Sequence, residues 1–208
     1  MAIDLAHAGA AAVHAIDVSI VALRSGAAAA GANRAAVTFE LMDGEELAYS
    51  NDSFDLIYGR SILHHLSLTK ALPEIRRVLR PEGRAIFLEP LAHNPVLRLS
   101  RWLTPRLRSP DERPLRVGDF ALLRRYFTAV HAEYFHLATL AALPFRRFPG
   151  VPKAIGWLDH LDRLLFATPL RRYAWVVVLT LAGRRSERSN EGLAGRAGLA
   201  GSGVHGTR

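Results

Sequence analysis

The chain has 208 residues and is half hydrophobic, which suits one globular domain with a buried core. It has no cysteine, so disulfides and thiolate metal sites are excluded, and a reducing cytoplasm is the expected compartment. Asp4 interrupts any secretory signal, and the longest apolar runs, 137–145 and 173–182, are far short of the roughly 20 residues that span a bilayer.

The formal charge of +8 is unevenly distributed along the chain. Residues 1–95 carry 8 Lys and Arg against 11 Asp and Glu, whereas residues 96–208 carry 19 against 8. Nearly all the basic residues are arginine. Two interpretations stay open: an arginine-rich codon usage, or an anionic substrate or membrane surface that the second half meets.

Hydrophobic periodicity predicts alternating helices and short strands through residue 89. The first element is a short strand at 12–16, and Ser19 then caps a helix over 20–30. Further strands are expected at 37–41, 54–58 and 85–89. An amphipathic helix is expected over 67–79, with its regular part starting near Leu72 so that Pro73 takes the first position. Residues 81–83 are a predicted turn.

The pattern is looser after residue 90. It predicts a helix over 95–102 and a second helix over 119–126 that Asp119 caps. It also predicts a strand at 130–135, a helix around 155–165 and a buried strand at 175–181. The last stretch, 184–208, is rich in Gly, Ser and Arg and is expected to be a disordered tail. The alternation as a whole predicts an α/β fold.

Doubly wound sheets bind ligands outside the carboxyl ends of their strands. Three predicted strands place candidate residues there. Asp17 ends the first and can accept hydrogen bonds from both hydroxyls of a ribose. Asp43, followed by Gly44, ends the second and can pair with an exocyclic amine such as that of adenine. Gly59 and Arg60 end the third, where a missing side chain permits close approach to a backbone.

Six blocks resemble, in order and spacing, the class I S-adenosylmethionine (SAM)-dependent methyltransferases, especially the group with quinone-biosynthesis C-methyltransferases. They are AIDVS at 15–19, MDGEEL at 42–47, DSFDLI at 52–57, LHHL at 63–66, EIRRVLRPEGR at 74–84 and FLEP at 87–90. Their shared order over residues 10–90 is specific. The remainder, to about residue 182, matches only in topology.

The resemblance implies a doubly wound, mostly parallel Rossmann-like sheet with an antiparallel last strand, and SAM as the cofactor. It implies that Asp17 holds the SAM ribose and that Val18 packs on the adenine ring. It also implies that Asp43 faces the adenine amine and that the backbone of Gly44 donates to the ring.

The same resemblance places Gly59 and Arg60 at the methionine end of SAM. One family feature has no counterpart: a G-x-G-x-G segment, with its preceding strand, belongs before the helix at residues 2–8. Gly9 sits in the following turn and cannot replace it. We therefore expect that the first strand and the glycine-rich loop are missing from this sequence, and that the domain over 1–183 is incomplete at its N-terminus.

Four side chains are candidates on the acceptor side. His64 and His65 are general-base or substrate-contact candidates, or else one caps the following helix while the other is a satisfied, half-buried imidazole. Glu89 and His93, at the end of strand 85–89, could also reach a substrate. The pair at 45–46 is expected to be a solvated turn.

These observations predict methyl transfer from SAM to a small-molecule or lipid-like acceptor, with no metal. Residues 91–169 are expected to include substrate-cap insertions, whose apolar runs and Arg-Arg pairs suit either peripheral contact with an anionic membrane or a cap over the pocket. A truncated, inactive remnant or binding protein is the alternative. Nucleic-acid binding is not expected, because the chain lacks an interleaved aromatic and basic motif.

Overall fold

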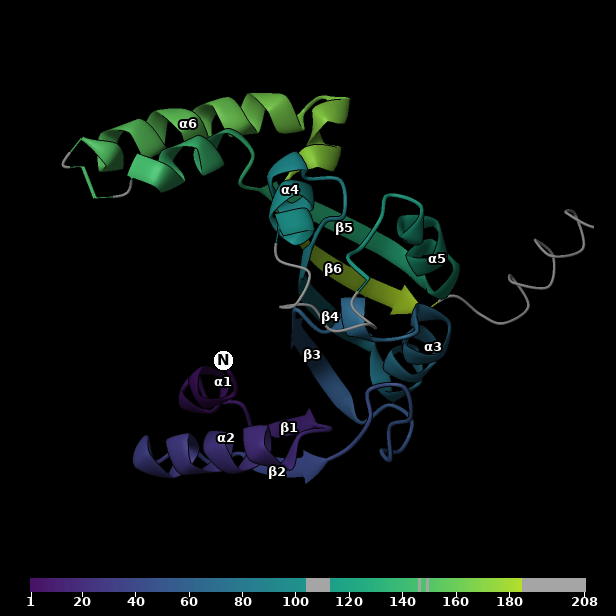
Figure 1. Ribbon diagram of the computed structural model, residues 1–208. Helices are drawn as coiled ribbons and strands as arrows, with labels where there is room; N and C mark the ends of the chain where they lie inside the picture. Colours follow the sequence, from purple (N-terminus) through teal and green to yellow (C-terminus); the bar gives the residue numbers. More distant parts are fainter. Residues whose placement is uncertain (104–112, 146, 149, 185–208) are drawn as a thin grey trace, which may run out of the picture.

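The computed structural model describes residues 1–103, 113–145, 147–148 and 150–184 (Figure 1). The tail expected at 184–208 lies outside the described residues except for the backbone of Arg184. Strands form two sheets, of two and four strands, with helices packed around them. No described helix has the length and apolarity needed to cross a membrane.

The first sheet belongs to an N-terminal βαβ unit. Helix α1 (Ala2–His7) precedes β1 (His14–Asp17), α2 (Ile20–Ala32) and β2 (Thr38–Leu41). The two strands pair in parallel, and the Ser19 hydroxyl caps α2 by accepting from the Ala22 N–H at 3.3 Å, as predicted. Sequence periodicity therefore located this unit to within two residues at each end of its strands.

The second sheet has the order β3–β4–β6–β5. Strand β3 (Phe54–Arg60) pairs in parallel with β4 (Leu79–Pro90), and β6 (Val176–Arg184) lies antiparallel between β4 and β5 (Phe127–Phe135). This confirms the predicted α/β fold with an antiparallel last strand. Its buried core is built from α3, the sheet and α5, with members such as Leu72, Phe87 and Leu179.

The remaining helices are α3 (Leu68–Val78), α4 (Pro95–Leu103), α5 (Asp119–Tyr126) and α6 (Val151–Phe166), with short 3₁₀ turns η1 (Leu63–His65), η3 (Ala138–Phe145) and η4 (Pro169–Tyr173). In Figure 1, α6 and η3 form a layer beyond the ends of β5 and β6. The buried Asp162 carboxylate of α6 holds the two together by accepting the N–H groups of residues 137–139 at 2.5–3.3 Å.

Two local predictions were wrong. Helix α3 begins at Leu68, so Pro73 lies inside it rather than at its first position; the buried face of Ala71, Leu72 and Ile75 offsets the lost backbone bond. The turn predicted at 81–83 lies within β4, where Leu79 pairs with Phe54 but the next partners are Arg84 and Leu56. The extra residues bulge out of the ladder instead of ending the strand.

Strand pairing does not join the two sheets. Within the described residues β1 pairs only with β2, and β3 only with β4. The resemblance implies that the family's first strand lies between β1 and β3, and its expected absence from this sequence stays a prediction. Contact comes from side chains instead: the Tyr49 hydroxyl donates to Glu40 of β2, and its ring packs edge-on against Phe54 of β3, with centroids 4.8 Å apart. Burial, with the Glu40 carboxylate, raises the pKa of Tyr49, so its hydroxyl stays protonated.

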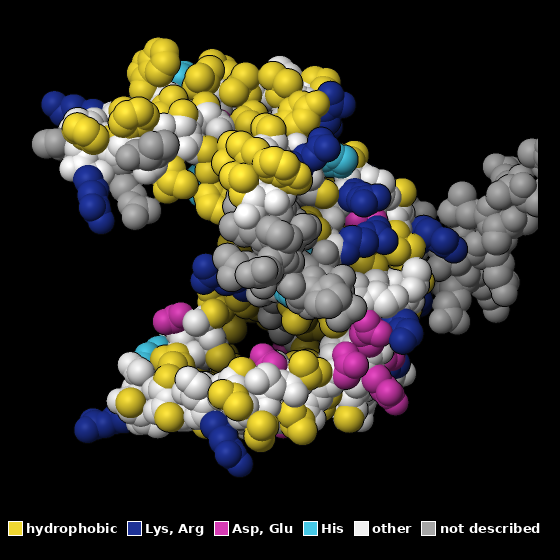
Figure 2. Space-filling view, in the orientation of Figure 1, with side chains coloured by type: hydrophobic (Ala, Val, Ile, Leu, Met, Phe, Trp, Pro, Cys, Tyr) yellow, Lys and Arg dark blue, Asp and Glu magenta, His cyan; other side chains and the backbone are white. Residues whose placement is uncertain are grey.

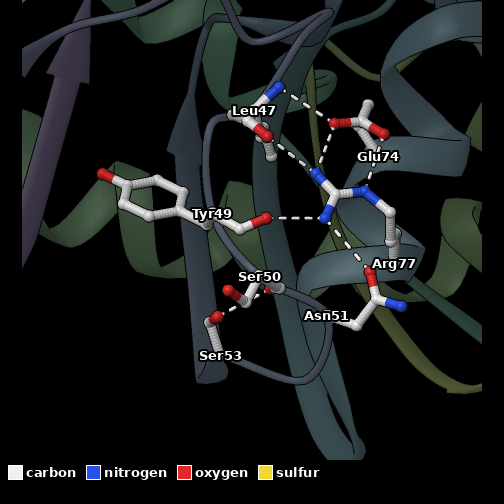
Figure 3. Close-up of polar contacts among 7 residues, drawn as sticks. All are labelled: Leu47, Tyr49, Ser50, Asn51, Ser53, Glu74 and Arg77. Carbon is white, nitrogen blue, oxygen red and sulfur yellow. Dashed lines mark hydrogen bonds and ion pairs between the residues drawn. The ribbon is translucent and has the colours of Figure 1, made fainter.

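A guanidinium of α3 fixes the connection from β2 to β3 (Figure 3). Arg77 donates to the carbonyl oxygens of Leu47 at 2.7 Å and Tyr49 at 2.6 Å, and to the Asn51 side chain at 3.2 Å. Glu74 pairs with the same guanidinium at 2.7 Å and accepts the Leu47 N–H at 2.9 Å. The Arg77–Glu74 pair therefore forms hydrogen bonds with three backbone groups of a segment that belongs to no sheet. These bonds hold the segment on α3.

We predict that Arg77→Ala lowers the free energy of unfolding by about 1–3 kcal/mol, because two carbonyl groups lose charged donors. The matched control is Arg80→Ala, whose guanidinium forms an exposed ion pair with Asp55 worth roughly 0–1 kcal/mol and donates to one carbonyl, that of Asp52, at 3.1 Å. Urea unfolding of both variants measures the difference. Equal losses in the two variants would contradict the assigned role.

Candidate functional site

Two carboxylates end the strands of the first sheet. Asp17 is the last residue of β1, and its Oδ1 accepts the Ser19 N–H at 2.8 Å. Asp43 lies two residues after β2, and its Oδ1 accepts the Glu45 N–H at 2.9 Å. Both residues are exposed, and among the described residues the second oxygen of each has no hydrogen-bond partner. The parallel register brings the two strand ends together, since the Met42 N–H donates to the Asp17 carbonyl at 3.2 Å.

An uncovered apolar side chain stands beside these acids. Val18 directly follows Asp17 and is 72% exposed. Two carboxylate oxygens that lack partners, next to an apolar surface, can bind a flat ring with hydroxyl or amine groups at its edge. This is the chemistry that a nucleoside offers. The nucleoside contacts of Asp17, Val18 and Asp43 stay predictions.

The turn after β2 also contacts the loop after β3. A Cβ on Gly44 would lie 3.1 Å from the Leu66 side chain. Glu45 was expected in a solvated turn, but it is partly buried: it accepts the Ser67 N–H at 2.6 Å at the start of α3 and pairs with Lys70 at 3.1 Å. These bonds place the Asp43 turn directly beside the segment that carries the two histidines, so the strand ends of the two sheets contribute to one region.

A buried carboxylate organises the loop after β3. Glu89, in β4, is fully buried, and its Oε1 accepts the N–H groups of Ile62 and Leu63 at 2.9 Å each. Its Oε2 contacts Nδ1 of His64 at 2.7 Å. The sequence suggested Glu89 as a residue that could reach a substrate; instead both of its oxygens are used within the protein. Its signal in the sequence was a single acid in the otherwise apolar stretch 85–91.

The other predicted residues differ in their surroundings. Gly59 is buried, and a Cβ there would lie 2.5 Å from Phe87 and 2.7 Å from Ile62, so the missing side chain makes room for these two neighbours. Arg60 is exposed at the end of β3, and His93 is half-buried after β4. In the described part of the chain neither makes a hydrogen bond or ion pair. Their contacts with a ligand stay predictions.

Gly59→Ala should lower the free energy of unfolding by roughly 1–3 kcal/mol, because the new methyl group overpacks a close contact between β3 and β4. Gly156→Ala is the control, since that position lies inside α6 and a methyl group added there would meet nothing within 4 Å; there alanine should be neutral or stabilising. Thermal unfolding distinguishes them. A stable Gly59→Ala variant would show that the residue is not required for packing.

Comparison with known proteins agrees with this geometry. The family model of the methyltransferase domain matches residues 1–87. An uncharacterized methyltransferase of Bacillus subtilis, YcgJ, is 38% identical over 100 residues, which cover 47% of this chain and 39% of that protein. A glycine/sarcosine/dimethylglycine N-methyltransferase of Actinopolyspora halophila is 36% identical over 56 residues, which cover 26% of this chain and 10% of that protein. The chain thus spans less than half the length of either relative.

Solved structures share the fold. The crystal structure of YcgJ matches with a TM-score of 0.55 and 20% identity, covering 84% of this chain and 83% of that one. A SAM-dependent methyltransferase of Methanosarcina mazei matches with a TM-score of 0.56 and 17% identity, covering 89% and 88%. Phosphoethanolamine N-methyltransferase 2 of Haemonchus contortus, bound to S-adenosylhomocysteine, matches with a TM-score of 0.56 and 14% identity, covering 88% and 46%.

Proposed function

Residues 1–87 match the methyltransferase domain, and the sequence resembles the class I SAM-dependent methyltransferases. We propose that the protein transfers a methyl group from SAM to a small-molecule acceptor. The observation that carries the proposal is a pair of exposed carboxylates, Asp17 and Asp43, at the carboxyl ends of two paired parallel strands. The exposed side chain of Val18 directly follows Asp17. The quinone-biosynthesis subtype stays a prediction.

Each residue would have a separate task. The free oxygen of Asp17 would accept the ribose hydroxyls, Val18 would cover one face of the adenine, and Asp43 would accept from its amine. Gly44, next to Leu66, would offer backbone to the ring edge. Gly59 and Arg60 would border the methionine end, where Arg60 is exposed and can meet a carboxylate.

The chemistry makes modest demands on protein side chains. SAM supplies an activated methyl group that is displaced in line, so alignment and exclusion of water account for much of the rate enhancement. A base is needed only when the acceptor must lose a proton. The absence of an obvious catalytic motif in the sequence is therefore compatible with this function.

Asp17→Ala is predicted to weaken SAM affinity by roughly 1.5–3 kcal/mol. The reason is the loss of charge-assisted hydrogen bonds to the ribose. Asp55→Ala is the control, because among the described residues the hydrogen bonds of that exposed carboxylate in β3 are those from Arg80. Calorimetric titration that gives equal affinities for Asp17→Ala and the parent would refute the assignment.

We further propose a lipid-like acceptor and peripheral contact with an anionic membrane. Figure 2 shows hydrophobic side chains gathered over α4 and α6. Trp102 and Trp157 are each 74% exposed. Exposed tryptophans next to basic side chains are typical of proteins that bind at a membrane interface. Other exposed apolar residues in and next to α4, η3 and α6 are Leu99, Leu103, Phe145, Phe148 and Leu164. Exposed basic residues in and near these segments include Arg98, Arg147, Lys153, Arg171 and Arg172.

The protein should therefore co-sediment with anionic vesicles at physiological salt, and less so at high salt. Trp157→Ser should weaken vesicle binding severalfold with little effect on stability, because the ring is exposed. Val21→Ser, at an equally exposed apolar position on α2, is the control. No binding by the parent protein would leave the alternative that this face only covers the pocket.

A further inference from the structure

We propose that His64 is the general base of the methyl transfer, oriented by Glu89, and that the acceptor atom is a hydroxyl oxygen. This inference rests on the proposed methyltransferase function. It concerns a buried pair at the carboxyl ends of β3 and β4, where Nδ1 of His64 lies 2.7 Å from the Glu89 carboxylate.

The hydrogen-bond pattern defines the form of the imidazole. An ionised carboxylate only accepts, and Oε1 of Glu89 already accepts two backbone N–H groups. The contact of Oε2 with His64 therefore requires the hydrogen on Nδ1. In the neutral ring this leaves the lone pair on Nε2. A carboxylate that fixes the tautomer and direction of a histidine is the arrangement that prepares an imidazole to accept a proton.

The remaining ring nitrogen has no partner in the described part of the chain. The His64 side chain is only 6% exposed, so a proton acceptor at Nε2 would lie largely shielded from bulk water. The ring cannot swing away easily: it packs on His65 with centroids 4.1 Å apart, and the Arg113 N–H donates to the His64 carbonyl at 2.8 Å. The turn of Asp43 and Gly44 reaches the neighbouring Leu66, which places the same segment beside the proposed nucleoside contacts.

The need for a base selects the acceptor class. A neutral amine attacks with an available lone pair, and a thiol is appreciably ionised near neutral pH, whereas a phenolic hydroxyl with a pKa near 10 is not. In the step, the acceptor oxygen forms a bond to the methyl carbon while the carbon–sulfur bond breaks and its electron pair returns to sulfur. The hydroxyl proton moves to Nε2 of His64. The products are the methyl ether, S-adenosylhomocysteine and an imidazolium that later releases its proton to water.

The first measurement needs no acceptor. In ¹⁵N-histidine NMR spectra of the protein, His64 should show a protonated Nδ1 and an unprotonated Nε2 at neutral pH. Glu89→Gln should reverse this tautomer, because the amide can donate to Nδ1. A protonated Nε2 in the parent protein would overturn the proposal, whether or not SAM binds.

The second measurement compares His64→Gln with His131→Gln, which changes an exposed histidine of β5 outside the site. The assay follows S-adenosylhomocysteine formation on phenols with pKa values from about 7 to 10. His64→Gln should slow the methylation of weakly acidic phenols by roughly 10²–10⁴-fold. The methylation of phenols that are already ionised should slow much less, and the affinity for SAM should not change. The change at His131 should have little effect on any of these rates. The hydroxyl assignment would be overturned if His64→Gln slowed the methylation of all phenols equally, or of none. It would also be overturned if the parent enzyme methylated amines but no phenol. Failure of the parent to bind SAM would instead refute the methyltransferase function.

Discussion

The buried carboxylate of Glu89 is the constraint on which the candidate site depends. Removing a carboxylate from water is costly unless hydrogen bonds replace its hydration. Three donors converge on Glu89, all from residues 62–64. The loop after β3 therefore has one conformation that satisfies the charge, and β4 fixes where that loop lies. Gly59 contributes by allowing Phe87 and Ile62 to meet at the same strand end.

A second set of bonds connects this loop with the first sheet. No strand pairing links β1 or β2 to β3 within the described residues. The link is the chain between β2 and β3, which Arg77 and Glu74 hold on α3 through its backbone. Glu45 then bonds the start of the same helix at Ser67. As a result, α3 holds the turn that follows Asp43 next to the loop that carries His64.

The sequence predicted helices and strands well where the hydrophobic periodicity and the helix-capping residues agree. Ser19 before an apolar run predicted α2, and the β-branched run at 175–181 predicted β6. It failed where tertiary contacts override local preference: Pro73 is tolerated inside α3 because the helix buries a strongly apolar face, and residues 81–83 bulge within β4 because the ladder resumes at Arg84. The candidate acids were predictable from strand ends. The Glu89–His64 pair was not, because it joins residues 25 apart in sequence through a fold that periodicity does not specify.

A structure of the protein with S-adenosylhomocysteine tests the central claim, that the strand ends of the two sheets form one cofactor site, with the nucleoside at the first sheet and the amino-acid end at the second. We expect the ribose hydroxyls within hydrogen-bond distance of Asp17 and the adenine amine beside Asp43. The thioether sulfur should lie on the side of the site that His64 Nε2 faces. Ligand bound elsewhere, with Asp17 and Asp43 still open to solvent, would contradict the assignment of the site.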